Sequence, residues 1–352
     1  MILIMGRDSM HSFGSYLKDY LEYKNISQTE FSKRLGISQK HMNEILNGNK
    51  CITLEMAGNI ERLTNIPSNF IIAIETKKNL IDSINLKYGN EDNLKKIIKN
   101  DFCFKELKDK NWIKFKDLEN IYQVAIDILD LLCVKDFDAH NNLEEYVLFK
   151  KKGNDYNKLA LWIAHCDKLV SNQDISIYDS SRLNELVNEL LNDSYNTGIN
   201  LDNISKILNK YGIYFICEKA LSGTKVRGCF KVKGKTPAIY ITGNYTSKDS
   251  LYFELFHEIG HLKSDYVIAQ SKTIIDGDLL REKRADEFAY KTMISDNYWN
   301  DILNIIKESN YEKKLLKYSK DNKICMSFIV GKLAFNKKIK YSSKFYNDNR
   351  NQ

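Results

Sequence analysis

Two histidines four residues apart flank an acidic residue in the segment His257-Glu258-Ile259-Gly260-His261. On a helix, this spacing places both imidazoles on one face, one turn apart, where they can share a metal ion. Glu258 lies about 100° further round the helix than His257, so it can take a proton from a metal-bound water without being a ligand. Zinc lowers the pKa of such a water to about 7. The segment therefore predicts a zinc-hydrolase site with one Zn²⁺ per chain.

A tetrahedral catalytic zinc site needs a third protein ligand, which leaves the fourth position for water. The metzincin pattern would place a His at position 267, but Val267 stands there. The gluzincin pattern takes a Glu from a following helix, and Glu282 supplies it 21 residues after His261. Asp286, one turn after Glu282, is expected to accept the remaining N–H of a ligand histidine, most simply His257, and so to fix its tautomer. Two acidic residues are weaker candidates for the ligand: Asp278 and Glu287.

The elements that must hold this site follow from hydrophobic patterning. Helical periodicity predicts helices over residues 204–211, 248–262 and 278–294. Short apolar runs predict strands over residues 213–217, 229–232 and 238–242. Together they predict an α+β domain with a small mixed sheet.

The strand just before the zinc helix is the candidate substrate-binding element. It consists of Ala238, Ile239, Tyr240, Ile241 and Thr242. An exposed edge strand can pair with an extended peptide through main-chain hydrogen bonds. An ordinary sheet edge without a substrate is an equally good interpretation.

The first part of the chain predicts five short helices within residues 10–78. Ser27 begins a capping-box pattern at the start of the second helix, which ends at Gly36. Ser38 and Thr53 have the residue type and position of N-caps for the third and fourth helices.

The second and third of these helices, joined by a tight glycine turn, have the pattern of a helix-turn-helix. The start of the third helix is polar, and its side chains can reach base edges and phosphates from a major groove. These side chains are Ser38, Gln39, Lys40, His41 and Asn43. Gln28, at a helix N-terminus, suits a phosphate contact. The alternative is a helical docking module with a solvated polar face.

Composition narrows the class of protein only slightly. The net charge of +7 permits contact with nucleic acid without requiring it. Seven scattered cysteines argue against a disulfide framework, and none forms a C-x-x-C pair that would indicate a cysteine-based zinc knuckle. No apolar stretch reaches the roughly 18 residues of a membrane span. We expect a cytoplasmic protein with no membrane partner.

Residues 79–182 carry weaker patterning and predict a helical middle region. The sequence leaves open whether this region is a spacer, a sensor or a dimer interface. His140 and His165 fall within it, and we interpret both as structural.

The chain resembles two known families, one at each end. Residues 27–48 resemble lambda-repressor-like (Xre-type) helix-turn-helix domains. Their words S-Q-T-E-F-S-K-R-L-G-I-S and E-I-L-N-G are most similar to those of HigA-type antitoxins. Residues 249–293 resemble the ImmA/IrrE family of zinc peptidases through F-E-L-F-H-E-I-G-H-L and R-E-K-R-A-D-E-F-A-Y-K-T-M. The words L-S-G-T-K-V-R-G, P-A-I-Y-I-T and F-I-V-G-K-L-A-F are also similar to that family.

These resemblances imply a multidomain, mainly α protein. Residues 1–78 would form an all-α helix-turn-helix domain and residues 79–182 a helical middle region. Residues 183–352 would form an α+β gluzincin-like peptidase domain. Two departures from the ImmA/IrrE pattern stand out. Met293-Ile294-Ser295 replaces L-L-M-P, and Lys263-Ser264-Asp265 stands where an additional histidine often follows the zinc helix.

The resemblance to the peptidase family implies the same site residues: His257, His261 and Glu282 as ligands, with Glu258 as the base. Members of this family cleave repressor proteins in stress or mobile-element circuits. HigA-type heads repress their own operons, and such heads usually read paired half-sites as dimers. The expected partners are therefore operator DNA, a second copy of the chain, and a protein substrate or cognate toxin or repressor.

Two functions from different classes remain in competition. The first is a DNA-binding zinc endopeptidase that cuts a regulatory protein. The second is a non-catalytic repressor or antitoxin of a toxin–antitoxin or mobile-element operon, whose zinc domain is structural or senses a ligand. The intact Glu258 favours the first, because a purely structural zinc site has no use for a general base.

Overall fold

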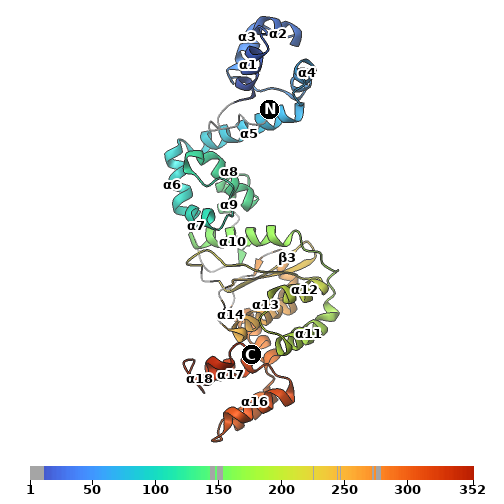
Figure 1. Ribbon diagram of the computed structural model, residues 1–352, viewed down its shortest axis with the longest axis vertical. Coiled ribbons are helices and arrows are strands. Elements are labelled where there is room, and N and C mark those ends of the chain that lie inside the picture. Colours follow the sequence, from blue (N-terminus) through green and yellow to red (C-terminus); the bar gives the residue numbers. More distant parts are fainter. Residues whose placement is uncertain are drawn as a thin grey trace. The chain divides into compact units, whose positions relative to one another are not determined.

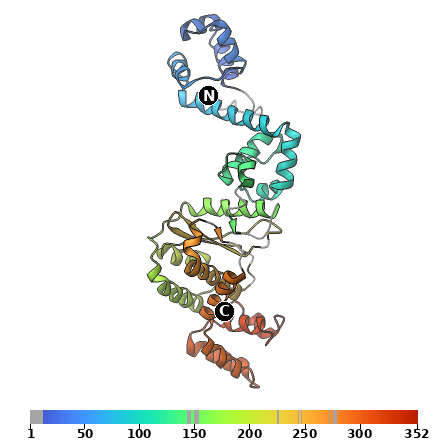
Figure 2. The ribbon, with the colours of Figure 1, turned by 180° about the vertical axis from the view of Figure 1, so that it is seen from behind.

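The computed structural model describes residues 12–142, 147–148, 154–224, 226–243, 245, 247–271, 273–274 and 279–352. The chain divides into two compact units (Figures 1 and 2). The first comprises the chain up to Asn100 together with Leu107–Asp130, and the second comprises Asp101–Glu106 and Leu131–Gln352. The fold is mainly helical with one small mixed sheet, which confirms this part of the predicted class. Within the described ranges, no helix has the length and apolar character needed to cross a membrane.

The first unit begins with five helices, as the sequence predicts. They are α1 (Phe13–Tyr23), α2 (Gln28–Leu35), α3 (Gln39–Leu46), α4 (Leu54–Thr64) and α5 (Ser68–Tyr88). The Ser27 hydroxyl accepts a hydrogen bond from the backbone N–H of Glu30 at 3.1 Å, and the Ser38 hydroxyl accepts one from that of His41 at 3.1 Å. Gly36 ends α2 with a φ of 74°, a left-handed conformation that glycine adopts without strain.

The core of these five helices includes one charged side chain, Glu75 of α5, which is 5% exposed. Its two oxygens accept hydrogen bonds from the backbone N–H groups of Phe13 and Ile52, each at 3.2 Å. Phe13 begins α1, so Glu75 satisfies one of the donors that every helix N-terminus leaves open. The apolar residues around it are Phe13, Leu17, Leu21, Phe31, Leu35, Met42, Ile45, Leu46, Ile52, Ala57, Ile60, Ile66 and Ile71.

The predicted middle region is helical. Its elements are α6 (Glu91–Asp101), α7 (Phe104–Asp109), η1 (Leu118–Asn120), α8 (Ile121–Leu132), α9 (Phe137–Asn142) and α10 (Asn154–Val170). Three more helical elements precede β2: η3 (Ser180–Arg182), α11 (Leu183–Asn196) and α12 (Leu201–Lys210).

The sheet of the second unit has the strand order β1-β5-β3-β4-β2. Its strands are β1 (Val147–Leu148), β2 (Tyr214–Cys217), β3 (Gly228–Lys233), β4 (Thr236–Ile241) and β5 (Thr273–Ile274). The β3 and β4 strands pair antiparallel, with Phe230 opposite Ile239, and β2 and β4 pair parallel. Successive side chains point to opposite faces of a strand. One face of the sheet packs against α10, and the other packs against α13 (Lys248–Ala269) (Figure 1).

The interpretation of Ala238 to Thr242 as an edge strand is wrong. Ala238 to Ile241 lie in β4, which pairs with β2 on one side and with β3 on the other, and Thr242 directly follows this strand. All five are buried, at no more than 3% exposure. Tyr240 packs against α10, where its hydroxyl donates a hydrogen bond to Asp167 at 2.7 Å. With both edges paired, this strand has no free main-chain groups with which to bind a peptide.

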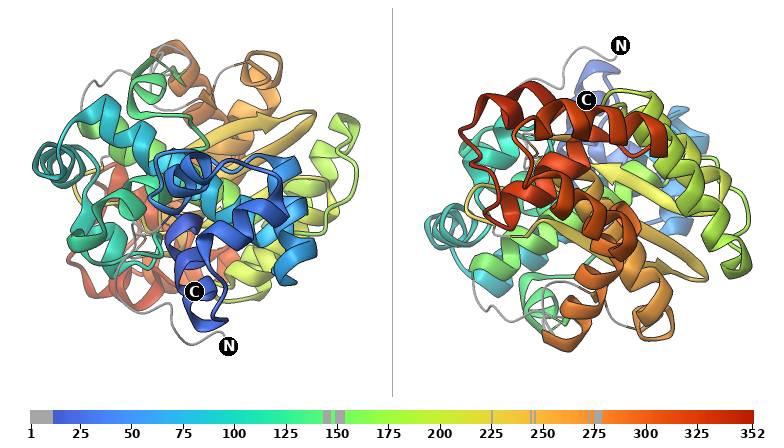
Figure 3. Two further views of the ribbon diagram at one scale, coloured as in Figure 1. Left: turned by 90° about the horizontal axis from the view of Figure 1, so that it is seen from above. Right: turned by 90° about the horizontal axis from the view of Figure 1, so that it is seen from below.

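Two long helices carry the predicted zinc residues. They are α13 (Lys248–Ala269) and α14 (Leu279–Met293). Four helices follow them: α15 (Asp296–Ile305), α16 (Tyr311–Asn322), α17 (Met326–Phe335) and α18 (Lys344–Asn349). The second view of Figure 3 shows these C-terminal helices in orange and red at one end of the second unit. Phe328 of α17 contacts the ring of Tyr252 on α13. The C-terminal helices therefore pack into the same hydrophobic core as the sheet and α13.

Glu75 gives a test of the first unit. We expect Glu75→Ala to lower the free energy of unfolding of this unit by about 1–3 kcal/mol, because two buried N–H donors lose their acceptor. Hydrogen exchange of the amides of α1 to α4 in the full chain would measure the change. Glu22→Ala, at an exposed glutamate of α1, is the matched control. Equal protection in the two variants would contradict the role of Glu75.

Candidate metal centre and nucleic-acid interface

The two predicted zinc histidines lie side by side on the buried face of α13. His257 is 7% exposed and His261 is 2% exposed. Their Nε2 atoms are 3.1 Å apart. The four-residue spacing therefore places both donor atoms at one point, as a shared ion requires.

Glu282 reaches this point from α14. Its two oxygens lie 3.3 Å from the Nε2 of His257 and 3.5 Å from the Nε2 of His261. The close approach of the two helices depends on Gly260, because a Cβ there would lie 2.9 Å from the Cα of Ala285. Small residues on both helices thus bring the acidic side chain of one against the histidines of the other.

Each histidine directs its other ring nitrogen to a carboxylate. The Nδ1 of His257 is 2.9 Å from Asp286, as the sequence leads us to expect for a tautomer-fixing partner. The Nδ1 of His261 is 2.9 Å from Asp265, a residue that the sequence analysis does not assign. Its position four residues after His261 was an available signal, since residues i and i+4 share a helix face.

The donor set fits a metal ion. One donor atom from each of His257, His261 and Glu282 lies within 4.8 Å of the others. For tetrahedral zinc with ligand bonds of about 2.0–2.1 Å, neighbouring ligand atoms are about 3.3 Å apart, close to the 3.1 Å that separates the two Nε2 atoms. If both Nδ1 atoms donate to carboxylates, two Nε2 lone pairs face each other, an arrangement that only a cation or a shared proton stabilises.

Electrostatics at the site also favour positive charge. Burial and the neighbouring His257 lower the pKa of His261 below its usual value, and burial acts in the same direction on His257. Hydrogen bonds to Asp286 and Glu282, together with the nearby charges of Glu258 and Glu254, nevertheless raise the pKa of His257 well above its usual range. A group of carboxylates that raises the pKa of a buried imidazole will also attract a divalent cation.

The predicted base, Glu258, is 3% exposed and lies between α13 and the start of β3. Gly228 is the first residue of β3, and a Cβ there would lie 2.2 Å from the Oε1 of Glu258. The same Cβ would lie 3.1 Å from the Oε1 of Glu254, one turn earlier on α13. Any larger residue at position 228 would therefore collide with the Glu258 carboxylate.

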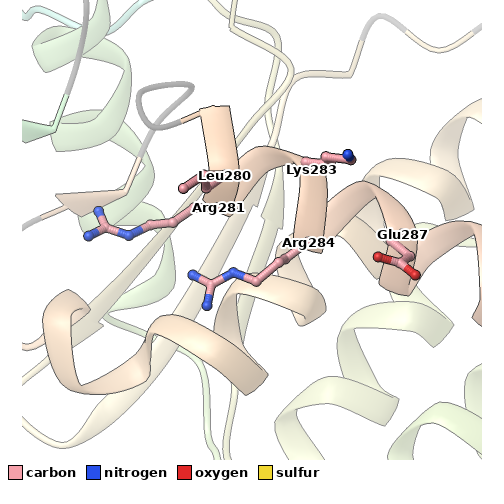
Figure 4. A pocket seen from close by; sticks show the side chains of 5 residues that line it. All are labelled: Leu280, Arg281, Lys283, Arg284 and Glu287. Carbon is pink, nitrogen blue, oxygen red and sulfur yellow. The ribbon is translucent and has the colours of Figure 1, made fainter.

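The two weaker ligand candidates have different outcomes. Glu287 is exposed and pairs with Lys291 at 2.6 Å, so it takes no part in the donor set. It lines a shallow pocket of about 400 Å³ on the outer face of α14 (Figure 4). Asp278 lies outside the described residues.

A row of aromatic side chains begins beside His257. Its imidazole lies 6.3 Å from the ring of Phe253, which lies 4.7 Å from that of Tyr290. Tyr290 in turn lies 5.4 Å from Phe335, which is 60% exposed. Burial, together with the charge of Asp286, raises the pKa of Tyr290 to about 12, so its hydroxyl keeps its proton at neutral pH. A row of aromatic side chains thus leads from His257 to the exposed Phe335.

The side chains expected to contact DNA lie at the start of α3 and of α2. Gln28, Ser38, Gln39, Lys40 and Asn43 are exposed. The Ser38 hydroxyl is already engaged as the N-cap of α3, and the Gln39 amide donates to the Thr29 hydroxyl at 2.9 Å. His41 is only partly exposed, and its Nε2 is buried without a hydrogen-bond partner in the described part of the chain.

The helix-turn-helix family model matches residues 17–71, a range that runs from α1 to α5. This protein is a DNA-binding transcriptional regulator. No curated protein and no solved structure matches its sequence or fold significantly. The assignment of the regulator's second unit therefore depends on its geometry.

The two histidines of the middle region have unequal surroundings in this regulator. His140 is 2% exposed, lies 2.8 Å from Asn157, and stacks on Tyr156. His165 is half-buried on α10. Neither belongs to the donor set, and the interpretation of both as structural stays a prediction.

Metal content tests the donor set directly. We expect the purified regulator to hold about one zinc per chain, and we expect His257→Ala and Glu282→Ala to hold almost none, because two ligands do not retain the ion. Elemental analysis after dialysis against a weak chelator would measure this. Glu287→Ala, on the same helix as Glu282, should keep its zinc. A Glu282→Ala variant that also keeps it would show that Glu282 is not a ligand.

Proposed function

We propose that the second unit of this regulator is a zinc-dependent endopeptidase of the ImmA/IrrE type, which cuts a regulatory protein. The observation that carries the proposal is the convergence of His257, His261 and Glu282 in a buried seam that also contains Glu258. A structural zinc site is normally closed by four protein ligands, whereas a catalytic site keeps a position open. Among the residues that the structure describes, three donors lie beside a buried carboxylate, which favours the catalytic class.

In this proposal His257, His261 and Glu282 hold the ion, and Asp286 orients His257. Zinc, when bound, would act as a Lewis acid toward a peptide carbonyl and would lower the pKa of a water molecule. Glu258 takes a proton from the attacking water, whose oxygen bonds to the carbonyl carbon. The same carboxylate then delivers this proton to the leaving nitrogen as the C–N bond breaks. The products are a carboxylate and an amine.

The surroundings of the site support a peptide substrate. The exposed Phe335 and the half-buried Tyr290 and Phe253 offer apolar surface beside His257. Such a surface suits the side chains of a protein segment better than a sugar or a phosphate group, which would need polar partners. Paired on both sides, β4 is not available to bind the substrate.

The first unit would direct this activity to one operon. We propose that residues 1–78 form the DNA-binding domain, residues 79–182 a connecting region, and residues 183–352 the peptidase domain. Gln39, Lys40 and Asn43 would face the major groove, with Gln28 at a phosphate. We also propose a homodimer, because helix-turn-helix heads usually read two half-sites.

Cleavage by the wild type and by Glu258→Gln separates the peptidase from the non-catalytic repressor. Each protein is loaded with zinc and incubated with the proteins encoded beside its gene. We expect wild type to cut one of them and Glu258→Gln to be slower by about 10²–10⁴-fold, because an amide cannot accept the proton. Equal zinc content in the two proteins is the control. If both leave every candidate intact, the peptidase proposal should be dropped.

A second variant, Gly228→Ala, changes the position of the base without changing its chemistry. The new methyl group should push the flexible end of Glu258 aside while the fold and the zinc content stay intact. Cleavage should therefore fall as it does in Glu258→Gln. An active Gly228→Ala variant would show that the present position of Glu258 is not the one it uses.

DNA binding provides an independent test of the first unit. We expect Gln39→Ala with Lys40→Ala to weaken binding to the gene's own promoter by about 10–100-fold or more, since a base contact and a phosphate contact are both lost. Footprinting at fixed salt would measure it. Lys320→Ala, which removes one exposed lysine from α16, is the control. An unaltered footprint for the double variant would refute the assignment of these two contacts.

A further inference from the structure

Asp265 is the most deeply buried acidic side chain that contacts a histidine of the donor set. It lies on α13, one turn after His261, and it is 2% exposed. Its Oδ2 is 2.9 Å from the Nδ1 of His261. A carboxylate removed from water this completely is costly unless each oxygen has a partner. The surroundings of its second oxygen therefore decide what this residue does.

Two arginines of α14 supply the second partner. The Oδ1 of Asp265 lies 3.2 Å from Nη2 of Arg284 and 3.6 Å from Nε of Arg281. Both guanidinium groups lie on one side of α14, away from Lys283 and Glu287 (Figure 4). The carboxylate thus divides its oxygens between His261 of the zinc motif and two arginines outside it.

We propose that Asp265, held by Arg281 and Arg284, is a positioning residue for the metal centre. It keeps His261 in the tautomer that carries its proton on Nδ1, so that the Nε2 lone pair points at the ion. The two arginines pair with the Asp265 carboxylate and fix its direction. This inference rests on the proposed metal centre and extends it beyond the predicted set of residues.

The two helices of the site brace each other in this arrangement. The zinc helix α13 carries both histidines and Asp265, and α14 carries Glu282 and Asp286 with the two arginines. Arg281 directly precedes Glu282 in the chain. A movement of α14 that withdrew Glu282 would therefore also release Asp265, and with it His261. The packing of α14 on α13 therefore holds both the ligand Glu282 and the positioning residue Asp265 in place.

The two histidines have unequal protection from water. The side chain of Asp286, which contacts His257, is 47% exposed, whereas that of Asp265 is 2% exposed. If Asp286 is removed, water can take its place as the hydrogen-bond acceptor for His257. The buried Nδ1 of His261 has no such access to water. The loss of Asp265 should consequently cost more metal affinity than the loss of Asp286.

Zinc affinity of the full chain tests this role. We expect Asp265→Asn, which keeps the shape of the side chain, to weaken zinc binding by about 10–100-fold in competition with a chromophoric chelator. Asp286→Asn should lose less, and Glu287→Gln should match wild type. The absorption spectrum of the cobalt-substituted protein should also change in Asp265→Asn, because His261 would no longer be held in one orientation. Arg284→Gln, at a half-exposed site, should weaken zinc binding in the same direction if Asp265→Asn does not fold.

The outcomes distinguish a positioning role from a structural one. If Asp265→Asn melts at a lower temperature without metal but binds zinc and cobalt like wild type, Asp265 only stabilises the fold and the inference fails. If wild type itself binds neither ion, the metal centre fails, and the role of Asp265 fails with it. The wild-type measurement alone identifies this second case.

Discussion

Buried negative charge on α13, where this helix packs against α14 and β3, is the constraint on which the second unit depends. Glu254, Glu258 and Asp265 are each at most 5% exposed, and Glu282 approaches them from the neighbouring helix. Moving carboxylates out of water is strongly unfavourable unless positive charge accompanies them. Arg281 and Arg284 provide it for Asp265. At the facing Nε2 atoms of His257 and His261, a proton or a metal ion supplies the positive charge that the nearby carboxylates require.

The sheet packs against the other side of these buried carboxylates. Lys231 and Tyr240 both bind Asp167 of α10, the first at 2.8 Å and the second at 2.7 Å, which holds β3 and β4 to the helix on their far face. On the near face, Gly228 leaves space for the Glu258 carboxylate. The position of the candidate base is therefore fixed by packing on both sides of the sheet.

Local features of the sequence predict most elements and the paired histidines, whereas Glu282 was predicted from the gluzincin pattern. Caps at Ser27 and Ser38 and the spacing of His257 and His261 involve residues at most four apart, so the chain itself specifies them. Strand order is a different matter, because a strand's alternation reveals its two faces but not its neighbours. The assignment of β4 as an edge failed for this reason. For Asp265, the spacing of four residues from His261 was a local signal that the prediction did not use, whereas its arginine partners come from another helix and local spacing could not reveal them.

Contacts in the middle region show why its role could not be read from periodicity. Glu106 accepts hydrogen bonds from the backbone N–H of Ser222 at 2.9 Å and from its hydroxyl at 2.6 Å. Lys158 donates to the carbonyl of the same serine at 3.0 Å. That serine lies in the loop that leads to Gly228, and the two side chains that hold it come from the region between the predicted domains. The middle region is thus part of the support of β3, and a spacer without tertiary contacts would not account for these bonds.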